Sequence, residues 1–174
     1  MINKYLSITL LFSLMLSTGC DNEDRSAAIN SRTVQTQAKA AFEKCTQTVF
    51  SISDISKPFP SVNQIEGLSQ SVDGALSFQS TGKDPHMHLP ATLGKSLYLV
   101  KIAVMAPTKT TFEFFYKNEK GNYNGDQLIL YPIKKGENTF FLKVEDENAI
   151  SAIRIDPGKT SGQYTLNEFS IRTL

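Results

Sequence analysis

Apolar residues repeat with a period of two from Gly74 to the end of the chain. Leu76 and Phe78 alternate with Ser77 and Gln79, and similar segments follow at intervals of about ten to fifteen residues. Such alternation places apolar side chains on one face of a strand and polar ones on the other. No long amphipathic helix is expected after residue 48, and parallel strands would need helical crossovers. The pattern therefore predicts an all-β, antiparallel β-sandwich.

Eight strands are expected, and two of them have special features. The run at residues 96–106 is apolar on both faces, which predicts that both are covered. In the last strand Leu166, Phe169 and Ile171 break the alternation by one residue, which predicts a β-bulge. Tyr131 and Phe141 fall on outward positions and are candidates for a stacking platform or a partner patch. The strands are expected at residues 76–79, 86–89, 96–106, 111–116, 128–133, 140–145, 153–155 and 164–171.

The N-terminal segment has the order of a secretory signal. Lys4 precedes a short apolar stretch, and small residues lead into Cys20. The sequence Leu16-Ser17-Thr18-Gly19-Cys20 resembles the bacterial lipobox, although Ser17 stands where the family usually has an aliphatic residue. The resemblance implies cleavage before Cys20 and a lipid on that cysteine; the alternative is a secreted protein cut elsewhere. Asp21 resembles an inner-membrane retention signal, so we expect a membrane-anchored lipoprotein on the periplasmic face, with the inner membrane favoured.

Three segments follow from these features: a signal peptide at 1–19, a lipidated tether with a short helix at 20–48, and the sandwich at 49–174. The alanines near Phe42 favour the helix, whereas the prolines at 58 and 60 favour extended or irregular chain. The alternatives for residues 33–70 are an added strand, a cover over a sheet edge, or partial disorder. Without its signal the chain has 17 basic and 17 acidic residues, so there is no basic excess for anionic lipid and no nucleic-acid partner is expected. Cys45, then the only free thiol, is expected to be buried and inert.

Several motifs after residue 70 are similar to one family. They are Gly82-Lys83-Asp84-Pro85-His86-Met87-His88-Leu89-Pro90, the apolar strand 97–104, Phe114-Phe115-Tyr116, Ile153-Arg154-Ile155-Asp156-Pro157-Gly158, and Leu166-Asn167-Glu168-Phe169-Ser170-Ile171 with Gly162. Together they resemble the galactose-binding-like β-sandwich, a jelly-roll shared by many carbohydrate-binding modules. The variant in question is attached to bacterial enzymes of surface polysaccharides. The resemblance implies this fold and a role near a glycan, but no binding residue is carried over from it.

The two Asp-Pro elements and the two histidines offer limited chemistry. Asp84 and Asp156 are interpreted as turn residues, and Arg154 as a partner for one of these carboxylates. His86 and His88 lie two apart, so a strand places both imidazoles on one face. Together with Asp84 they are weak candidates for a zinc site, but no further ligand is identifiable. We therefore predict no metal and no cofactor.

The polar stretch 117–126 is the candidate ligand site. Tyr123 stands between Asn122 and Asn124, with Tyr116 at the edge, a mixture suited to a sugar ring and its hydroxyls. The alternative is that Tyr123 packs the loop down. No catalytic constellation is recognisable, so the chain is not predicted to be an enzyme. The hypothesis is an envelope lipoprotein that binds a glycan in surface-polysaccharide assembly. The alternative is a structural lipoprotein that docks on an envelope protein complex.

Overall fold

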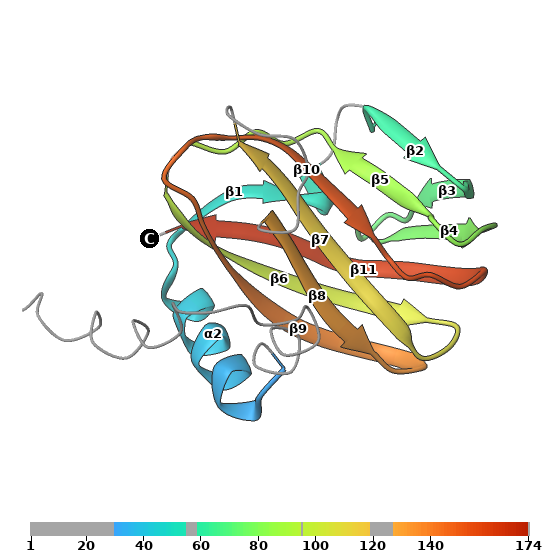
Figure 1. The fold of residues 1–174 in the computed structure, drawn as a ribbon, viewed down its shortest axis with the longest axis horizontal. Coiled ribbons are helices and arrows are strands. Elements are labelled where there is room, and N and C mark those ends of the chain that lie inside the picture. The colour runs from blue at the N-terminus through green and yellow to red at the C-terminus, as the bar shows by residue number, and fades with distance from the viewer. Residues whose placement is uncertain (1–29, 55–58, 95, 119–126, 174) are drawn as a thin grey trace, which may run out of the picture.

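The computed structural model describes residues 30–54, 59–94, 96–118 and 127–173. They form two antiparallel β-sheets and an α-helix (Figure 1). In chain order the elements are α2 (Arg32–Lys44), β1 (Gln47–Ser51), the 3-10 turn η1 (Ile52–Asp54), β2 (Ser61–Asn63), β3 (Ile65–Gln70), β4 (Leu76–Ser80), β5 (His86–Leu89), β6 (Leu97–Ala106), β7 (Thr110–Asn118), β8 (Leu128–Ile133), β9 (Gly136–Glu145), β10 (Ile150–Asp156) and β11 (Gly162–Thr173).

Sheet A has the order β3-β4-β11-β6-β9, with β1 also paired to β11, and sheet B has the order β2-β5-β10-β7-β8. From β4 onward the chain changes sheet at every connection except that between β7 and β8. The predicted all-β sandwich is confirmed, and each expected strand is present. Three further short strands, β1 to β3, come from residues 33–70, where an added strand was one of the alternatives; β2 and β3 lie in the part that was expected to be extended or irregular.

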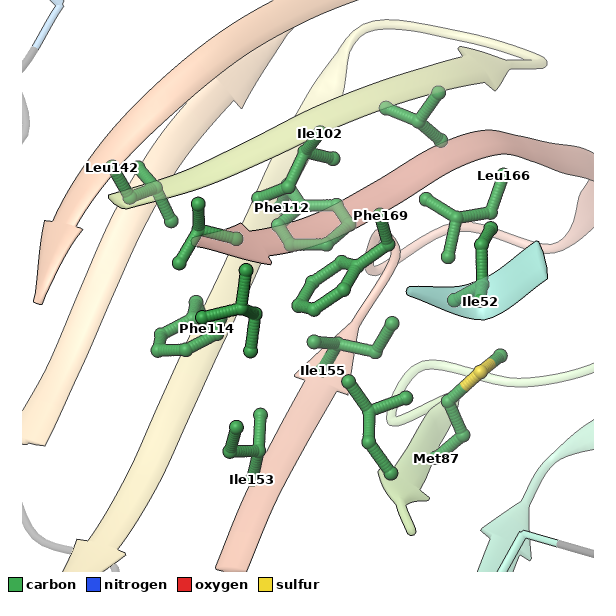
Figure 2. Packing of buried hydrophobic residues seen from close by; sticks show 14 of the residues in the cluster. Ile52, Met87, Ile102, Phe112, Phe114, Leu142, Ile153, Ile155, Leu166 and Phe169 are labelled. Atoms are coloured by element: carbon green, nitrogen blue, oxygen red, sulfur yellow. The ribbon is translucent and has the colours of Figure 1, made fainter. Parts of the chain in front are cut away.

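The core lies between the sheets and is built from the inward positions of the alternating segments. Figure 2 shows Phe112 and Phe114 of β7 facing Phe169 of β11. The rings of Phe114 and Phe169 stack with centroids 6.2 Å apart, and Phe112 meets Phe140 edge-on at 5.4 Å. Each fully buried side chain of this size contributes about 1.5–3 kcal/mol. Burial of the apolar side chains at these alternating positions therefore supplies most of the driving force for joining the two sheets.

The predicted bulge in the last strand is present in β11. Leu166 pairs with Val104 and Glu168 with the adjacent Ala103, so Asn167 is the extra residue. The bulge moves the inward positions by one residue, which is why both Leu166 and Phe169 are buried.

Helix α2 packs on the outer face of sheet A, over β6 and β9. Ser31 caps its first turn, where the Ser31 hydroxyl accepts a hydrogen bond from the Val34 amide. The ring of Phe42 lies 5.5 Å from that of Phe141 on β9, and Leu99 of β6 is buried in the same cluster. The outer side of β6 is therefore covered at Leu99, as predicted, whereas Met105 at its other end is 42% exposed.

The same helix closes the free edge of sheet A. The side-chain amide of Gln35 donates to the Phe141 carbonyl at 3.0 Å and accepts from the Phe141 amide at 2.9 Å. Because β9 is the last strand of sheet A, this side chain takes the place that a neighbouring strand would have. Phe141 does face outward, as expected, but the helix covers it, so it is not a surface platform.

Cys45 ends helix α2 and is buried, as predicted. Its thiol donates to the Ala41 carbonyl at 3.4 Å. Burial raises the pKa of this thiol, and the positive charge of Arg172 offsets only part of that effect. The thiol is therefore a weak nucleophile in this position.

Candidate functional site

The outer face of sheet B brings polar and aromatic side chains from five strands together. Strand registers align Ser61, His88, Arg154, Phe115 and Leu128 in one row across β2, β5, β10, β7 and β8. The strand order can be followed in Figure 1. Because side chains directly opposite one another share a face of the sheet, this row crosses the whole outer surface. We call this surface the sheet B face.

Arg154 is the centre of the polar half of this face. Its Nε and Nη2 atoms donate to the two carboxylate oxygens of Asp156 at 2.7 and 2.6 Å. Nη2 also donates to Asp84 Oδ1 at 2.9 Å. The Asp156 hydrogen bond, acting against desolvation, raises the pKa of the arginine above its already high value. The expected pairing of Arg154 therefore includes both Asp-Pro elements, and with Asp156 it has the strong bidentate geometry.

The two carboxylates differ in their exposure. The side chain of Asp156 is 6% exposed, whereas that of Asp84 is 58% exposed. The Asp156 carboxylate is bound to Arg154 and has no hydrogen bond to a turn amide among the bonds found in the described residues. Its main role is therefore to hold the arginine in place. Asp84 leaves its second oxygen near solvent.

His86 and His88 flank the arginine on β5, on one face as predicted. His86 Nδ1 lies 3.4 Å from Asp84 Oδ2 and 3.1 Å from the Asp84 carbonyl oxygen. Burial lowers the pKa of His88, and the nearby His86 and Arg154 lower it further. His88 therefore presents a neutral imidazole at pH 7.

The structure regroups the residues that were weak metal candidates. Asp84, His86 and Asp156 place possible ligand atoms within 4.8 Å of one another, and His88 is not in this group. However, Arg154 occupies both Asp156 oxygens and one oxygen of Asp84. A cation at this point would have to displace the guanidinium group. The geometry is that of an ion-paired cluster, which we call the Arg154 cluster (Asp84, His86, Arg154 and Asp156).

The turn that carries Asp84 is hydrogen-bonded to the last residue of β2, Asn63, and to Gln64, which follows it. Gln64 Oε1 accepts from the Asp84 amide at 2.9 Å, and Asn63 Nδ2 donates to the Asp84 carbonyl at 2.8 Å. Gln64 has a positive φ of 50°, which is uncommon for a residue with a side chain. A Cβ atom added at Gly82 would overlap the Gln64 side-chain amide. Gly82 therefore leaves room for the Gln64 side-chain amide beside this turn.

We expect Gly82→Ala to lower the free energy of unfolding by about 1–2 kcal/mol, because the new methyl group displaces Gln64 from the Asp84 amide. Urea unfolding measures the change. The matched control is the same substitution in a Gln64→Ala background, where the overlap is gone and Gly82→Ala should cost much less. Equal costs in both backgrounds would contradict this account.

The other half of the sheet B face, formed by β7 and β8, contains an apolar strip. The guanidinium carbon of Arg154 lies 4.9 Å from the centroid of the Phe115 ring. The half-buried Leu128 lies across from Phe115 on β8, and the half-buried Leu130 and the exposed Pro132 continue the strip along the same side of β8. One continuous surface thus combines an apolar strip with oriented hydrogen-bonding groups.

The predicted loop site is only partly described. Tyr116 lies in the core cluster, where it is 8% exposed and packs against Phe114. Asn122, Tyr123 and Asn124 lie outside the described residues, so the loop site stays a prediction. The same holds for lipidation at Cys20. Tyr131, another expected platform, was predicted to face outward, and this is wrong: its half-buried ring packs against the core and stacks on Phe140 with centroids 3.8 Å apart.

The ends of this loop are fixed by Asp146. Asn118, the last residue of β7, donates to both Asp146 oxygens at 3.2 and 3.1 Å. Burial tends to raise the Asp146 pKa, but bonds from the Asn148 amide and from the Asn118, Asn148 and Gln127 side chains outweigh it and lower the pKa. Residues 118 and 127 are thereby joined to the turn between β9 and β10.

Sequence reasoning missed Phe115, Leu128 and Leu130 as site residues. Phe115 belongs to an aromatic triplet, and only the phase of the alternation separates it from its inward neighbours Phe114 and Tyr116. The alternation in β7 and β8 places these three residues on the outward face, and this was the signal from which they could have been predicted. The pairing of β7 with β10, which brings Phe115 to Arg154, cannot be derived from that phase.

The sequence matches no family model and no curated protein. The fold, however, is similar to solved carbohydrate-binding modules. The CBM1 module of BiXyn10A has a TM-score of 0.52 and 13% identity, covering 74% of this chain and all of that one. The C-terminal CBM6 of the laminarinase LamC from Zobellia galactanivorans has a TM-score of 0.51 and 14% identity, covering 73% of this chain and 100% of that module.

A third similar structure is the module CBM6cm-2 from Cellvibrio mixtus lichenase 5A, solved in complex with cellotriose. Its TM-score is 0.50 at 12% identity, and the match covers 74% of this chain and 99% of that module. The predicted carbohydrate-binding-module type of β-sandwich is thus confirmed as the fold. Within the described residues, no helix is long and apolar enough to span a membrane.

Proposed function

We propose that this protein is a non-catalytic, lipid-anchored envelope protein that binds a glycan on the sheet B face. The observation that carries the proposal is the meeting of the Arg154 cluster with Phe115, Leu128 and Leu130 on one face of sheet B. Sugar rings have apolar C–H faces and a rim of hydroxyl groups, so a site for them needs both kinds of surface side by side.

The polar half offers both donors and acceptors. Among the described residues nothing accepts a hydrogen bond from Arg154 Nη1, so its two N–H groups remain for a ligand. Asp84 Oδ2, 3.4 Å from His86 Nδ1, is a further acceptor on a side chain that is 58% exposed. Because Asp156 holds the guanidinium in place, little side-chain entropy is lost when a hydroxyl group binds. The carbohydrate-binding modules of similar fold support a glycan as the ligand.

Two closely placed carboxylates on this face do not form a free catalytic pair. Glu113 lies directly across from Asp156 in the register of β7 and β10. Glu113 is buried and ion-paired to Lys159 at 2.6 Å, and Asp156 is bound to Arg154. A glycosidase needs one carboxyl group that donates a proton and another that attacks or activates water. Both groups here are engaged by cations, which favours binding without hydrolysis.

The anchor and the cellular setting come from the sequence. The lipobox-like segment ending at Cys20 supports a lipid anchor on the periplasmic side, and the resemblance to modules of polysaccharide enzymes supports a role in surface-polysaccharide assembly. The alternative, docking on an envelope protein complex, would use the apolar strip of Leu128, Leu130 and Pro132 at the edge of sheet B.

Isothermal titration of the chain from Asp21 onward with envelope polysaccharide fragments tests glycan binding. We expect saturable binding that weakens at least tenfold in Phe115→Ala, equivalent to about 1.4 kcal/mol, because the apolar strip loses its aromatic ring. The matched control is Met105→Ala, an exposed position on the outer face of sheet A, which should bind as the original protein does.

Tyr123→Ala separates the sheet B face from the predicted loop site. Loss of binding in Tyr123→Ala alone would move the site to the loop. Loss in Phe115→Ala alone would support the sheet B face. No binding by folded protein would reject the glycan proposal, and crosslinking in the intact envelope would then test the docking alternative.

A further inference from the structure

The chain enters the sandwich on the side opposite to the sheet B face. Helix α2 begins at Arg32, directly after its cap, and lies on the outer face of sheet A. Its attachment is specific, because Gln35 is hydrogen-bonded to Phe141 and Phe42 is buried against the same residue. An anchor on the N-terminal segment would therefore be connected to the domain on its sheet A side.

The thickness of the molecule separates the two sides. A helix with its side chains is about 10–12 Å across, and the two sheets pack about 10 Å apart. With the outward side chains, the sheet B face lies about 25 Å beyond the outer surface of α2. Ten residues lie between Cys20 and Ser31, and the eleven chain steps from Cys20 to Ser31 can span at most about 36–40 Å.

The exposed surface of α2 suits contact with lipid headgroups. Its exposed side chains are polar, charged or small, and the charged ones have an excess of positive charge. They comprise Arg32, Thr33, Thr36, Gln37, Lys39, Ala40, Glu43 and Lys44. Lys39 and Glu43 pair at 3.8 Å. Although the chain without its signal is neutral overall, α2 therefore keeps a local positive excess, the charges of Arg32 and Lys44, which suits anionic headgroups.

From these observations we propose that the anchored protein rests with α2 and the sheet A side toward an anionic membrane and presents the sheet B face away from it. The inference rests on the proposed function, because it assumes the lipid at Cys20. To turn the sheet B face to the membrane, the ten residues between Cys20 and Ser31 would have to span about 25 Å, well over half of their maximum reach. The partner is therefore a polysaccharide chain in the aqueous space, and not the sugar headgroup of a lipid in the same membrane.

Headgroup quenching tests the orientation without any glycan. The lipidated full chain carries Cys45→Ala and one labelled cysteine, either Gln37→Cys on α2 or Ser61→Cys on the outer side of β2. It is inserted into phosphatidylethanolamine and phosphatidylglycerol vesicles that contain a nitroxide-headgroup lipid. We expect the label at position 37 to be quenched several-fold more than the label at position 61. When the tether is lengthened by thirty Gly and Ser residues, the labels at positions 37 and 61 should be quenched to a similar extent.

Equal quenching with the natural tether, or stronger quenching at position 61, would overturn the orientation. Absence of the protein from the vesicles would overturn it by removing the anchor on which it depends. If the orientation holds while the soluble chain binds no glycan in the titration, only the glycan proposal fails. A Cys20→Ala chain, which cannot be lipidated at that position, is the control for quenching by free protein.

Discussion

Arg154→Met should lower the free energy of unfolding by about 3 kcal/mol, measured by urea or thermal unfolding. The methionine keeps much of the aliphatic bulk against Phe115 but removes the guanidinium group. The Asp156 carboxylate, only 6% exposed in its side chain, then loses both of its short hydrogen bonds. An unpaired buried carboxylate is strongly destabilising, because neither water nor another cation replaces the lost partner.

Two further variants identify the cause of this loss. Asp156→Asn in the Arg154→Met background removes the unpaired charge and should recover a large part of the stability. Asp84→Asn alone should cost less than about 1 kcal/mol, because that carboxylate is mostly exposed and solvent screens its ion pair. If the double variant were as unstable as Arg154→Met, the damage would come from lost packing and not from a buried charge.

Phe42→Ala should remove about 3 kcal/mol from the docking of helix α2, because a ring that is 3% exposed leaves a cavity against Phe141. Arg172, whose guanidinium carbon lies 4.4 Å from the centroid of the Phe42 ring, loses its stacking partner as well. The Phe141 amide reports the change directly, because it donates to Gln35 only while the helix is docked. Hydrogen exchange at that amide should accelerate strongly.

The exposed-position variant Gln37→Ala is the control and should leave exchange at the Phe141 amide unchanged. Undocking also uncovers Leu99 and the free edge of β9, so Phe42→Ala should self-associate at lower concentration than the original protein. Unchanged protection of the Phe141 amide in Phe42→Ala would show that the hydrogen bonds of Gln35 hold the helix without the ring.

The sandwich could be predicted because alternation is a local property of the sequence. The polar neighbours of an apolar residue indicate which face of the strand it occupies, as they do for Leu76 and Phe112. The bulge at Asn167 appears as a one-residue shift in the same alternation. Strands β1 to β3 lack this signal because most of their side chains are exposed and prolines interrupt the segment. Their places depend on backbone pairing with β11, β5 and β4.

The candidate site could be predicted only in part, because it depends on pairing between distant strands. Asp84 and Arg154 are seventy residues apart and meet only through the pairing of β5 with β10. Arg154 was expected to pair with one carboxylate, and it binds two. The outward position of Phe141 was predicted correctly, but its cover by α2 depends on tertiary packing that the alternation does not encode.

The attachment of α2 also determines how the protein would respond to mechanical force. A pull on the N-terminal end reaches the Gln35 and Phe42 contacts one after another, whereas β1 is hydrogen-bonded along its length to the end of β11. The helix should therefore peel away before any strand is extracted. Unwinding its thirteen residues would add about 25 Å of reach. The sandwich would keep its shape under load, and its distance from the anchor would increase.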